Sequence, residues 1–344
     1  MAPSLNLPDF DSLPPVEGLP QGTAWGIFDK DGKKDVVGSL NLLTPDVVKE
    51  AYKEARDGVS ISLNWPLGAQ HTPGFSRKTL HHHVIDFNKT PLAGHGFDDE
   101  ISFNTQCSSQ WDSLVHYLHQ PTASAYNGFK PTQEGLVQAF GEQDTTGKYP
   151  TLHHWHTRGG LVGRGVLLDY RAWKASKGET YSPFDDTAIT IAELEEIAAW
   201  EKVELREGDI LIVRTGYTEE LSKPGITAEE QAALTATHKA IGVEGNVAAA
   251  KWFWNHHFAA VAGDALAFEV LPPRREDGSV GSINELVLHQ YFLALFGLNI
   301  GELWDLKALG EHAQKVGRYS FLLTSVPLNV PGAVGSPPNA LALF

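Results

Sequence analysis

The segment "FNTQCSSQWDSLVHY", residues 103–117, decides how this sequence is interpreted. Its first half alternates apolar and polar residues, as a strand with one buried face does. Its second half brings two amides, a carboxylate and an imidazole close together, from Gln106, Gln110, Asp112 and His116. Because residues i, i+2 and i+4 of a strand share a face, Gln106, Gln110 and Asp112 are expected to point the same way. His116 lies four residues beyond Asp112 and reaches the same point if the chain turns.

Two interpretations of this convergence are open at the level of the residues. An aspartate carboxylate can hold a divalent metal, and a neutral imidazole beside it can act as a general base. Glutamine oxygens are weak, neutral ligands, which complete a coordination shell or orient a substrate carbonyl. The alternative is a polar strand end whose side chains satisfy buried backbone groups.

Composition and charge exclude several classes of protein. The 344 residues are 42% hydrophobic and 20% charged, which is typical of a globular chain rather than a disordered one. A single cysteine, Cys107, excludes an internal disulfide and a cysteine-based zinc cluster. The net charge of −15, without a basic patch, argues against nucleic acid as a partner. No run of eighteen apolar residues and no secretory pattern occurs, so we expect a cytoplasmic protein without membrane association.

The order of predicted elements indicates the fold class. Proline-rich residues 1–21 predict an extended N-terminal arm, and residues 22–344 show no linker or repeat, so we expect a single domain there. The remaining elements are strands at 59–67, 81–87, 99–106, 164–170 and 208–217, a strand pair in each of 258–270 and 317–330, helices at 45–58, 191–203, 229–242 and 283–297, and a long loop at 118–150. Strands and helices that mix without strict alternation favour an α+β, or mixed α/β, fold.

The opening segment resembles the core motif of the cyclase or kynurenine formamidase-like family of metal-dependent hydrolases. That motif reads H-x-G-T-H-x-D-x-P-x-H, where this chain reads Q-C-S-S-Q-W-D-S-L-V-H. Further segments follow in the family's order along residues 22–344, among them "GSLNLLTP", "GRGVLLDY", "GDILIVRTGY", "GLNIGELWDL" and "PLNVPGAVGSPPNALA". The resemblance rests on the number and order of these segments, and it points to a variant branch with Q-x-x-x-Q-W-D-x-x-x-H.

The resemblance also implies roles for individual residues. Asp112 matches the metal-binding aspartate of the motif, and His116 matches the histidine that transfers protons. In their sequence context, His289 and Glu302 match a later pair of metal ligands. The resemblance therefore implies a metal site made by Asp112, His289 and Glu302, with His116 as the catalytic residue.

Other residues of the segment depart from the motif or admit two roles. Gln106 and Gln110 replace the first two motif histidines, which removes two strong ligands and leaves the amides as substrate-binding groups or weak ligands. Trp111 either stacks on an aromatic substrate or packs in the core. Outside the segment, Arg164 and Arg214 lie on predicted strands, where we expect paired structural arginines.

What the resemblance implies for the whole protein follows from the family. It implies a swivelling β/β/α-type fold, with a mixed barrel-like sheet flanked by helices, and a homodimer or homotetramer. The expected activity is hydrolysis of an amide or lactone in a small cyclic or aryl substrate, by water that His116 activates beside a divalent metal, manganese or zinc. Two alternatives stay open: a metal-independent cyclase, isomerase or dehydratase of a secondary-metabolite intermediate, and a non-catalytic protein that binds a small molecule.

Overall fold

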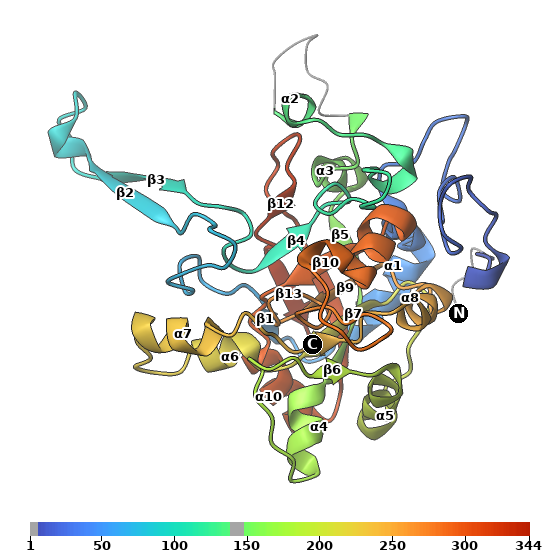
Figure 1. The fold of residues 1–344 in the computed structure, drawn as a ribbon. Helices are drawn as coiled ribbons and strands as arrows, with labels where there is room; N and C mark the ends of the chain where they lie inside the picture. The colour runs from blue at the N-terminus through green and yellow to red at the C-terminus, as the bar shows by residue number, and fades with distance from the viewer. Residues whose placement is uncertain (1–5, 138–147) are drawn as a thin grey trace.

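A mixed sheet of nine strands lies at the centre of the molecule (Figure 1). The computed structural model describes residues 6–137 and 148–344. Residues 1–5 of the predicted arm and 138–147 of the predicted loop therefore lie outside the described residues. The sheet curls into a half-barrel with helices around it, which confirms the predicted mixed α/β class and the barrel-like sheet.

The strand order is β1-β13-β11-β5-β7-β9-β10-β4-β12. The four central strands run parallel: β5 (Leu161–Asp169), β7 (Ile210–Arg214), β9 (Ala260–Gly263) and β10 (Asn299–Glu302). Antiparallel strands flank them, namely β1 (Ser60–Ser62), β13 (Ala340–Leu343) and β11 (Ser320–Ser325) on one side and β4 (Gln110–Asp112) and β12 (Gly335–Ser336) on the other. The parallel centre is buried on both faces, as parallel sheets usually are.

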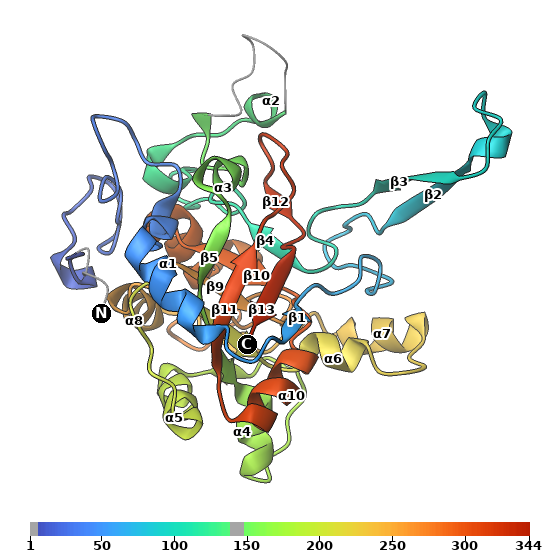
Figure 2. The same cartoon turned by 180° about the vertical axis from the view of Figure 1, so that it is seen from behind.

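Helices surround this sheet, and a pair of strands projects away from it (Figure 2). The helices are α1 (Pro45–Ala51), α2 (Gln133–Leu136), α3 (His153–Arg158), α4 (Tyr170–Ser176), α5 (Ile191–Glu201), α6 (Tyr217–Leu221), α7 (Ala228–Thr235), α8 (Val247–Asn255), α9 (Val287–His289) and α10 (Lys307–Val316). Strands β2 (His81–Asp86) and β3 (Phe97–Ser102) form a projecting hairpin, and β6 (Ala188–Ile189) pairs with β8 (Gly242–Val243). None of the helices in the described ranges has the length and apolar character needed to span a bilayer.

Alternation along the strands divides the core into two layers, one on each face of the sheet. In β7, Leu211 and Val213 belong to one hydrophobic cluster, while Ile210 and Ile212 belong to the other. Since successive side chains of a strand point to opposite faces, one apolar strand serves both layers. The apolar run of this segment is therefore the signature of a central strand.

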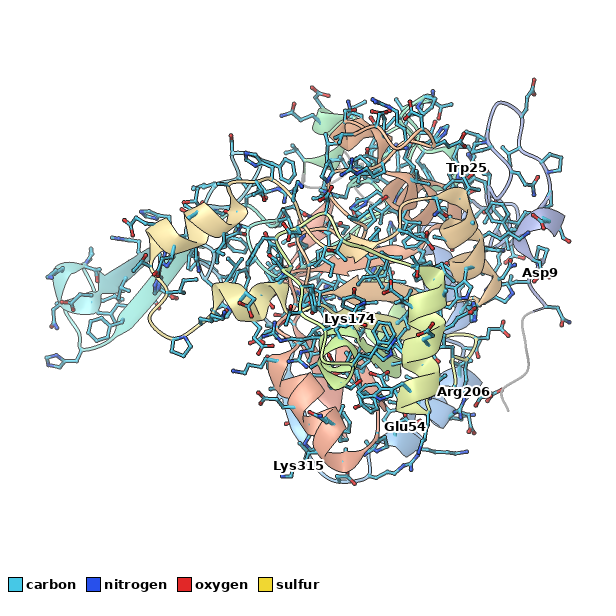
Figure 3. All side chains as sticks on the ribbon, turned by 60° about the horizontal axis from the view of Figure 1, so that its bottom comes forward. Asp9, Trp25, Glu54, Lys174, Arg206 and Lys315 are labelled. Carbon is cyan, nitrogen blue, oxygen red and sulfur yellow. The ribbon has the colours of Figure 1, made fainter. Side chains whose placement is uncertain are left out.

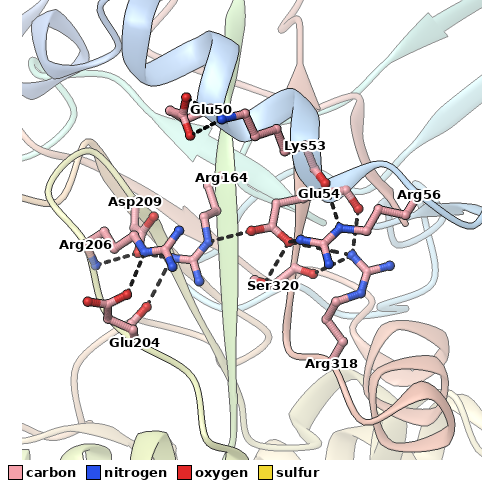
Figure 4. A network of polar contacts seen from close by, with 10 residues as sticks. All are labelled: Glu50, Lys53, Glu54, Arg56, Arg164, Glu204, Arg206, Asp209, Arg318 and Ser320. Atoms are coloured by element: carbon pink, nitrogen blue, oxygen red, sulfur yellow. Dashed lines mark hydrogen bonds and ion pairs between the residues drawn. The ribbon is translucent and has the colours of Figure 1, made fainter. Parts of the chain in front are cut away.

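Buried arginines link the sheet to the surrounding segments, and Figure 4 shows the contacts of one of them, Arg164. Arg164 on β5 donates to Glu54 at 3.1 Å and to Asp209 at 2.7 Å. Arg214 on β7 donates to Asp169 at 2.7 Å. Both arginines are thus paired structural residues, as predicted.

The N-terminal segment packs against the body of its own chain (Figure 3 labels Asp9 and Trp25 along it). Phe10 is buried, and its ring lies beside those of Tyr291 and Phe296. The Trp254 indole donates to the Pro8 carbonyl at 2.9 Å. The division into an arm at 1–21 and a single domain at 22–344 stays a prediction.

Residues 317–330, predicted as a strand pair, contain the single strand β11. Two further predicted elements differ from the structure, and both of these differences shape the candidate site. Residues 283–297 do not form one amphipathic helix, because a 3₁₀ turn and the short α9 lead into a π-helix, Gln290–Phe296, that is almost wholly buried. In 258–270 only β9 is a strand. The chain after β9 is irregular, and its Glu269 makes an isolated bridge to Val243. The chain also turns between β3 and β4, so Gln106 lies outside the strand that carries Gln110.

Candidate active site

Three acidic or imidazole side chains from separate elements meet at one end of the sheet. Asp112 ends β4, Glu302 ends the neighbouring β10, and His289 ends α9. The antiparallel register of β4 and β10 places Glu302 opposite Gln110. One potential ligand atom of each of the three residues lies within 4.8 Å of the other two, and all three residues are buried. The structure thus brings together the set that the resemblance implies.

The His289 ring is held between two carboxylates. Its Nδ1 donates to Glu269 at 2.8 Å, and its Nε2 donates to Glu302 at 3.1 Å. Glu269 is fully buried and also accepts the backbone N–H groups of His289 and Val287. Burial alone would disfavour the imidazolium, but the hydrogen bonds to Glu269 and Glu302 raise the pKa of His289 to about 10. A cation that took Nε2 as a ligand would replace the proton there, while Glu269 kept hold of Nδ1.

The two carboxylates that face each other across the site differ in their electrostatics. Burial is the main reason that the pKa of Asp112 is raised. Burial would also raise the pKa of Glu302, but the hydrogen bond and charge of His289 hold it below its ordinary value. Asp112 is therefore the carboxylate with more to gain from a further positive charge.

Gln106 and Gln110, which the resemblance aligns with motif histidines, donate hydrogen bonds to these carboxylates. Gln106 Nε2 donates to Asp112 Oδ1 at 2.5 Å. Gln110 Nε2 donates to Glu302 Oε2 and to Gln106 Oε1, both at 2.8 Å. The amides therefore hold the carboxylates in place, where histidines would offer nitrogen lone pairs to a metal.

Buried oxygens without a partner test whether the site suits a metal. Asp112 Oδ2 and Gln110 Oε1 are both buried, and neither has a hydrogen-bond partner among the described residues. Leaving such acceptors unsatisfied is costly, and a cation would satisfy them. Two carboxylates, an imidazole and an amide oxygen form a donor set that suits a divalent ion. The residues present fit the implied metal.

His116 stands at the edge of this group. Its Nε2 lies 4.0 Å from Asp112 Oδ1, and its side chain is 20% exposed. It lines a pocket of about 230 Å³ together with Phe75, Arg77, Tyr117, Leu266, Ala267, Leu271, Ile283, Leu286, His289 and Glu302. A small molecule in this pocket would touch both His116 and the buried group.

The structure does not bring Trp111 to this pocket. Its indole is fully buried, donates to Ser325 at 2.9 Å, and packs against the rings of Trp155 and Trp304. Because its side chain points to the opposite face of β4 from Gln110 and Asp112, the core role is the one it has. Cys107 is likewise buried and free.

Sequence reasoning missed several residues of the site. Glu269 stands alone in the apolar run "ALAFEVLPP", and a lone acid in such a run is a signal of a buried functional carboxylate. Tyr117 contacts His289 edge to face, with ring centroids 5.4 Å apart. Phe75 and Arg77 come from an irregular loop whose path no local pattern predicts.

Comparisons with known proteins agree with this geometry. The family model described as "Putative cyclase" matches residues 59–270. A search of curated proteins finds no match. The crystal structure of a novel cyclase has 28% identity and a TM-score of 0.75, and the alignment covers 94% of this chain and 99% of that one.

Two more distant structures share the fold. Isatin hydrolase A from Ralstonia solanacearum has 13% identity and a TM-score of 0.54, with 87% of this chain and 98% of that one covered. Isatin hydrolase A from Labrenzia aggregata, bound to benzyl benzoate, has 14% identity and a TM-score of 0.53, with 88% and 98% covered. The family model spans more than half of the chain and includes residues 103–117, so this protein belongs to the cyclase family.

Proposed function

We propose that this protein is a hydrolase that opens an amide or lactone of a small cyclic or aryl substrate. The observation that carries the proposal is the placement of His116 beside the buried group of Asp112, His289 and Glu302 at one apolar pocket. A small molecule in the pocket would therefore lie close both to the base, His116, and to the buried carboxylates. Hydrolysis of a carbonyl compound requires such an arrangement.

The relatives support hydrolysis as the reaction. The solved structures named isatin hydrolases share the fold, and their name describes hydrolysis of a small substrate. At 13% and 14% identity they share the fold alone, so the choice of substrate rests on this chain's own pocket. Its volume of about 230 Å³ is below the range of drug-sized pockets, which favours a molecule of one or two rings.

Asp112, His289 and Glu302 would hold the divalent ion, manganese or zinc, and the buried Gln110 Oε1, which has no hydrogen-bond partner among the described residues, is a candidate for a further ligand. When bound, such an ion supplies Lewis acidity. The chain's own residues prepare the site for it. Gln106 and Gln110 orient the carboxylates, and Glu269 fixes the His289 ring through Nδ1.

His116 supplies the proton transfers. Its Nε2 takes a proton from the attacking water and then returns it to the leaving nitrogen or oxygen, which keeps the proton count balanced. Asp112 lies close enough to stabilise the imidazolium that forms in between. The apolar wall of Leu266, Leu271 and Leu286 limits the access of bulk water.

A metal-independent reaction is the second candidate, and one observation favours it. Every side-chain nitrogen of His289, Gln106 and Gln110 already donates to a carboxylate or amide oxygen. These side chains therefore form a connected network without an ion. A cyclase, isomerase or dehydratase could use His116 as base beside this network. A pocket that only binds its ligand is the third candidate.

A His116→Asn variant tests the enzymatic role. Asparagine keeps the side chain polar and of similar size but cannot exchange protons near neutral pH. We expect kcat for the hydrolysis of a panel of lactones, cyclic imides and aryl formamides to fall by about 10²–10⁴-fold. The thermal midpoint should stay unchanged, because the His116 side chain makes no short hydrogen bond to the described residues.

Two controls complete this experiment. His153→Asn on α3 is a matched change of a half-buried histidine outside the pocket, and it should leave turnover unchanged. Full activity of His116→Asn would contradict the proposed mechanism. Failure of the wild-type protein to hydrolyse any member of the panel, while it still binds them, would favour the non-catalytic candidate.

A further inference from the structure

The loop that precedes the projecting hairpin carries two side chains into the pocket mouth. Phe75 and Ser76 have φ values of 60° and 55°, a left-handed conformation that residues other than glycine rarely adopt. Two such residues in succession store strain, and strain of this kind is often found at functional sites. The turn they make delivers Phe75 and Arg77 to the pocket that His116 lines.

Arg77 differs from the buried arginines of the sheet, because no carboxylate in residues 6–137 and 148–344 pairs with it. Arg164 and Arg214 both form salt bridges at 2.7 Å. The hydrogen bond of Arg77 is a long one, 3.4 Å, to the Gln106 carbonyl, and its guanidinium carbon lies 4.9 Å from the centre of the Phe75 ring. An arginine at a pocket mouth with its donors available is suited to a planar anion.

The pocket lining carries charged side chains of both signs. It includes the Glu302 carboxylate and the Arg77 guanidinium, and of these two groups only Arg77 attracts an anionic group. In the proposed hydrolysis, the product's new carboxylate forms from the scissile carbonyl beside His116. Arg77 is therefore suited to an anionic group that the substrate already carries.

The pocket walls indicate what carries that anionic group. Phe75 is 59% exposed and lines the pocket. Tyr117 also lines it, and its ring packs edge to face against the ring of His289. Leucine and isoleucine side chains complete the walls. Aromatic and aliphatic walls around about 230 Å³ suit a planar ring.

We propose that Arg77 and Phe75 form an anion-recognition subsite, and that the substrate of the hydrolase is a small aromatic molecule that bears a carboxylate. This inference rests on the proposed function in placing the reaction in the same pocket. Arg77 binds the substrate carboxylate, Phe75 contacts the ring, and the scissile carbonyl is directed toward His116.

Binding of benzoate and benzamide, two nearly isosteric probes that differ in charge, tests the subsite. Calorimetry at neutral pH should show benzoate binding to the wild-type protein at least about tenfold more tightly than benzamide, as a desolvated charge-assisted pair allows. Arg77→Gln should abolish that preference and leave benzamide binding unchanged. Arg77→Lys should keep part of it, because lysine retains the charge without the planar fork.

Lys78→Gln is the matched control, since it removes the same charge from the next residue, whose side chain is exposed and contacts Ser102 instead of the pocket. It should keep the benzoate preference. Equal affinity of the wild type for both probes, no binding of benzoate, or an equal loss in Lys78→Gln would each overturn the subsite. Because the assay measures binding alone, it is independent of whether the His116→Asn experiment supports hydrolysis.

Discussion

Glu201 shows how strongly burial acts on a single residue of this protein. Its carboxyl lies at the end of α5, where one oxygen accepts the Asp169 backbone N–H at 2.8 Å and the other has no partner among the described residues. Burial is the main cause that raises the pKa of Glu201 from 4.5 to about 9. The folded protein therefore holds this proton at neutral pH, whereas the unfolded chain releases it.

The sign of the resulting pH dependence follows from proton binding. Between pH 4.5 and 9 the folded state binds more protons than the unfolded state, so the free energy of unfolding falls as pH rises. The slope from this group is at most about 1.4 kcal/mol per pH unit. Glu201→Gln removes the group, so we expect its stability relative to wild type to increase steadily from pH 6 to pH 9.

Urea unfolding at several pH values in this window measures the effect. Glu196→Gln on the same helix is the control, because Glu196 is exposed and its ion pair with Lys177 is solvent-screened. Its profile should run parallel to that of the wild type. A parallel profile for Glu201→Gln would show that Glu201 is ionised in the folded protein, contrary to this prediction.

At the scale of elements, two helices with the same N-terminal device are expected to respond differently. Thr190 caps α5 and Thr227 caps α7, each in a reciprocal capping box with a glutamate three residues later. Helix α5 buries Leu194, Ile197 and Ala198, whereas α7 buries little more than Gln231. A cap supports global stability only if its helix unfolds together with the core.

Thr190→Ala should therefore lower the free energy of unfolding by about 1 kcal/mol, the usual cost of a lost N-cap. Thr227→Ala should cause fraying of α7 with a smaller global effect. Denaturant unfolding and native-state hydrogen exchange measure the two responses. An equal global loss in both variants would contradict the assignment of α7 as a weakly coupled element.

Elements with strong local signals were predictable from the sequence. The apolar runs of β5 and β7 and the capping boxes of α5 and α7 lie where the pattern places them. Residues 283–297 were misjudged because an apolar segment has the same composition in an α-helix and in a π-helix. The distinction arises from tertiary packing, which local propensity does not contain.

The candidate site was predictable in part. The resemblance led to Asp112, His289 and Glu302, which the structure brings together although they lie on three elements. The sequence does not predict the roles of Glu269 and Arg77, because their positions depend on how irregular segments of the chain fold over the ends of the sheet. The amide donors of Gln106 and Gln110 likewise acquire meaning only from the carboxylates that they face.

At the scale of the whole molecule, the fold brings the candidate ligands together from separate elements. The antiparallel contact of β4 with β10 places Glu302 opposite Gln110, two residues from Asp112 on the same face of β4, and residues of α9 and the π-helix pack into the core cluster beside His289. Asp112, His289 and Glu302 form one group of potential ligands among the described residues, so we expect a single divalent ion in each chain. The cytoplasmic location and the homodimer or homotetramer stay predictions.

The metal content of the purified protein is the most direct test of the proposed metal site. We would measure it by mass spectrometry, on wild type and Glu302→Gln purified without chelator or affinity metal, with Glu285→Gln, whose carboxylate pairs with Arg275 instead of facing the site, as the control. We expect one manganese or zinc ion per chain in wild type and the control, and its loss in Glu302→Gln because a carboxylate ligand is gone. No metal in the wild type, or full occupancy in Glu302→Gln, would contradict the proposed metal site and leave His116 with the two glutamines as the centre of a metal-free reaction.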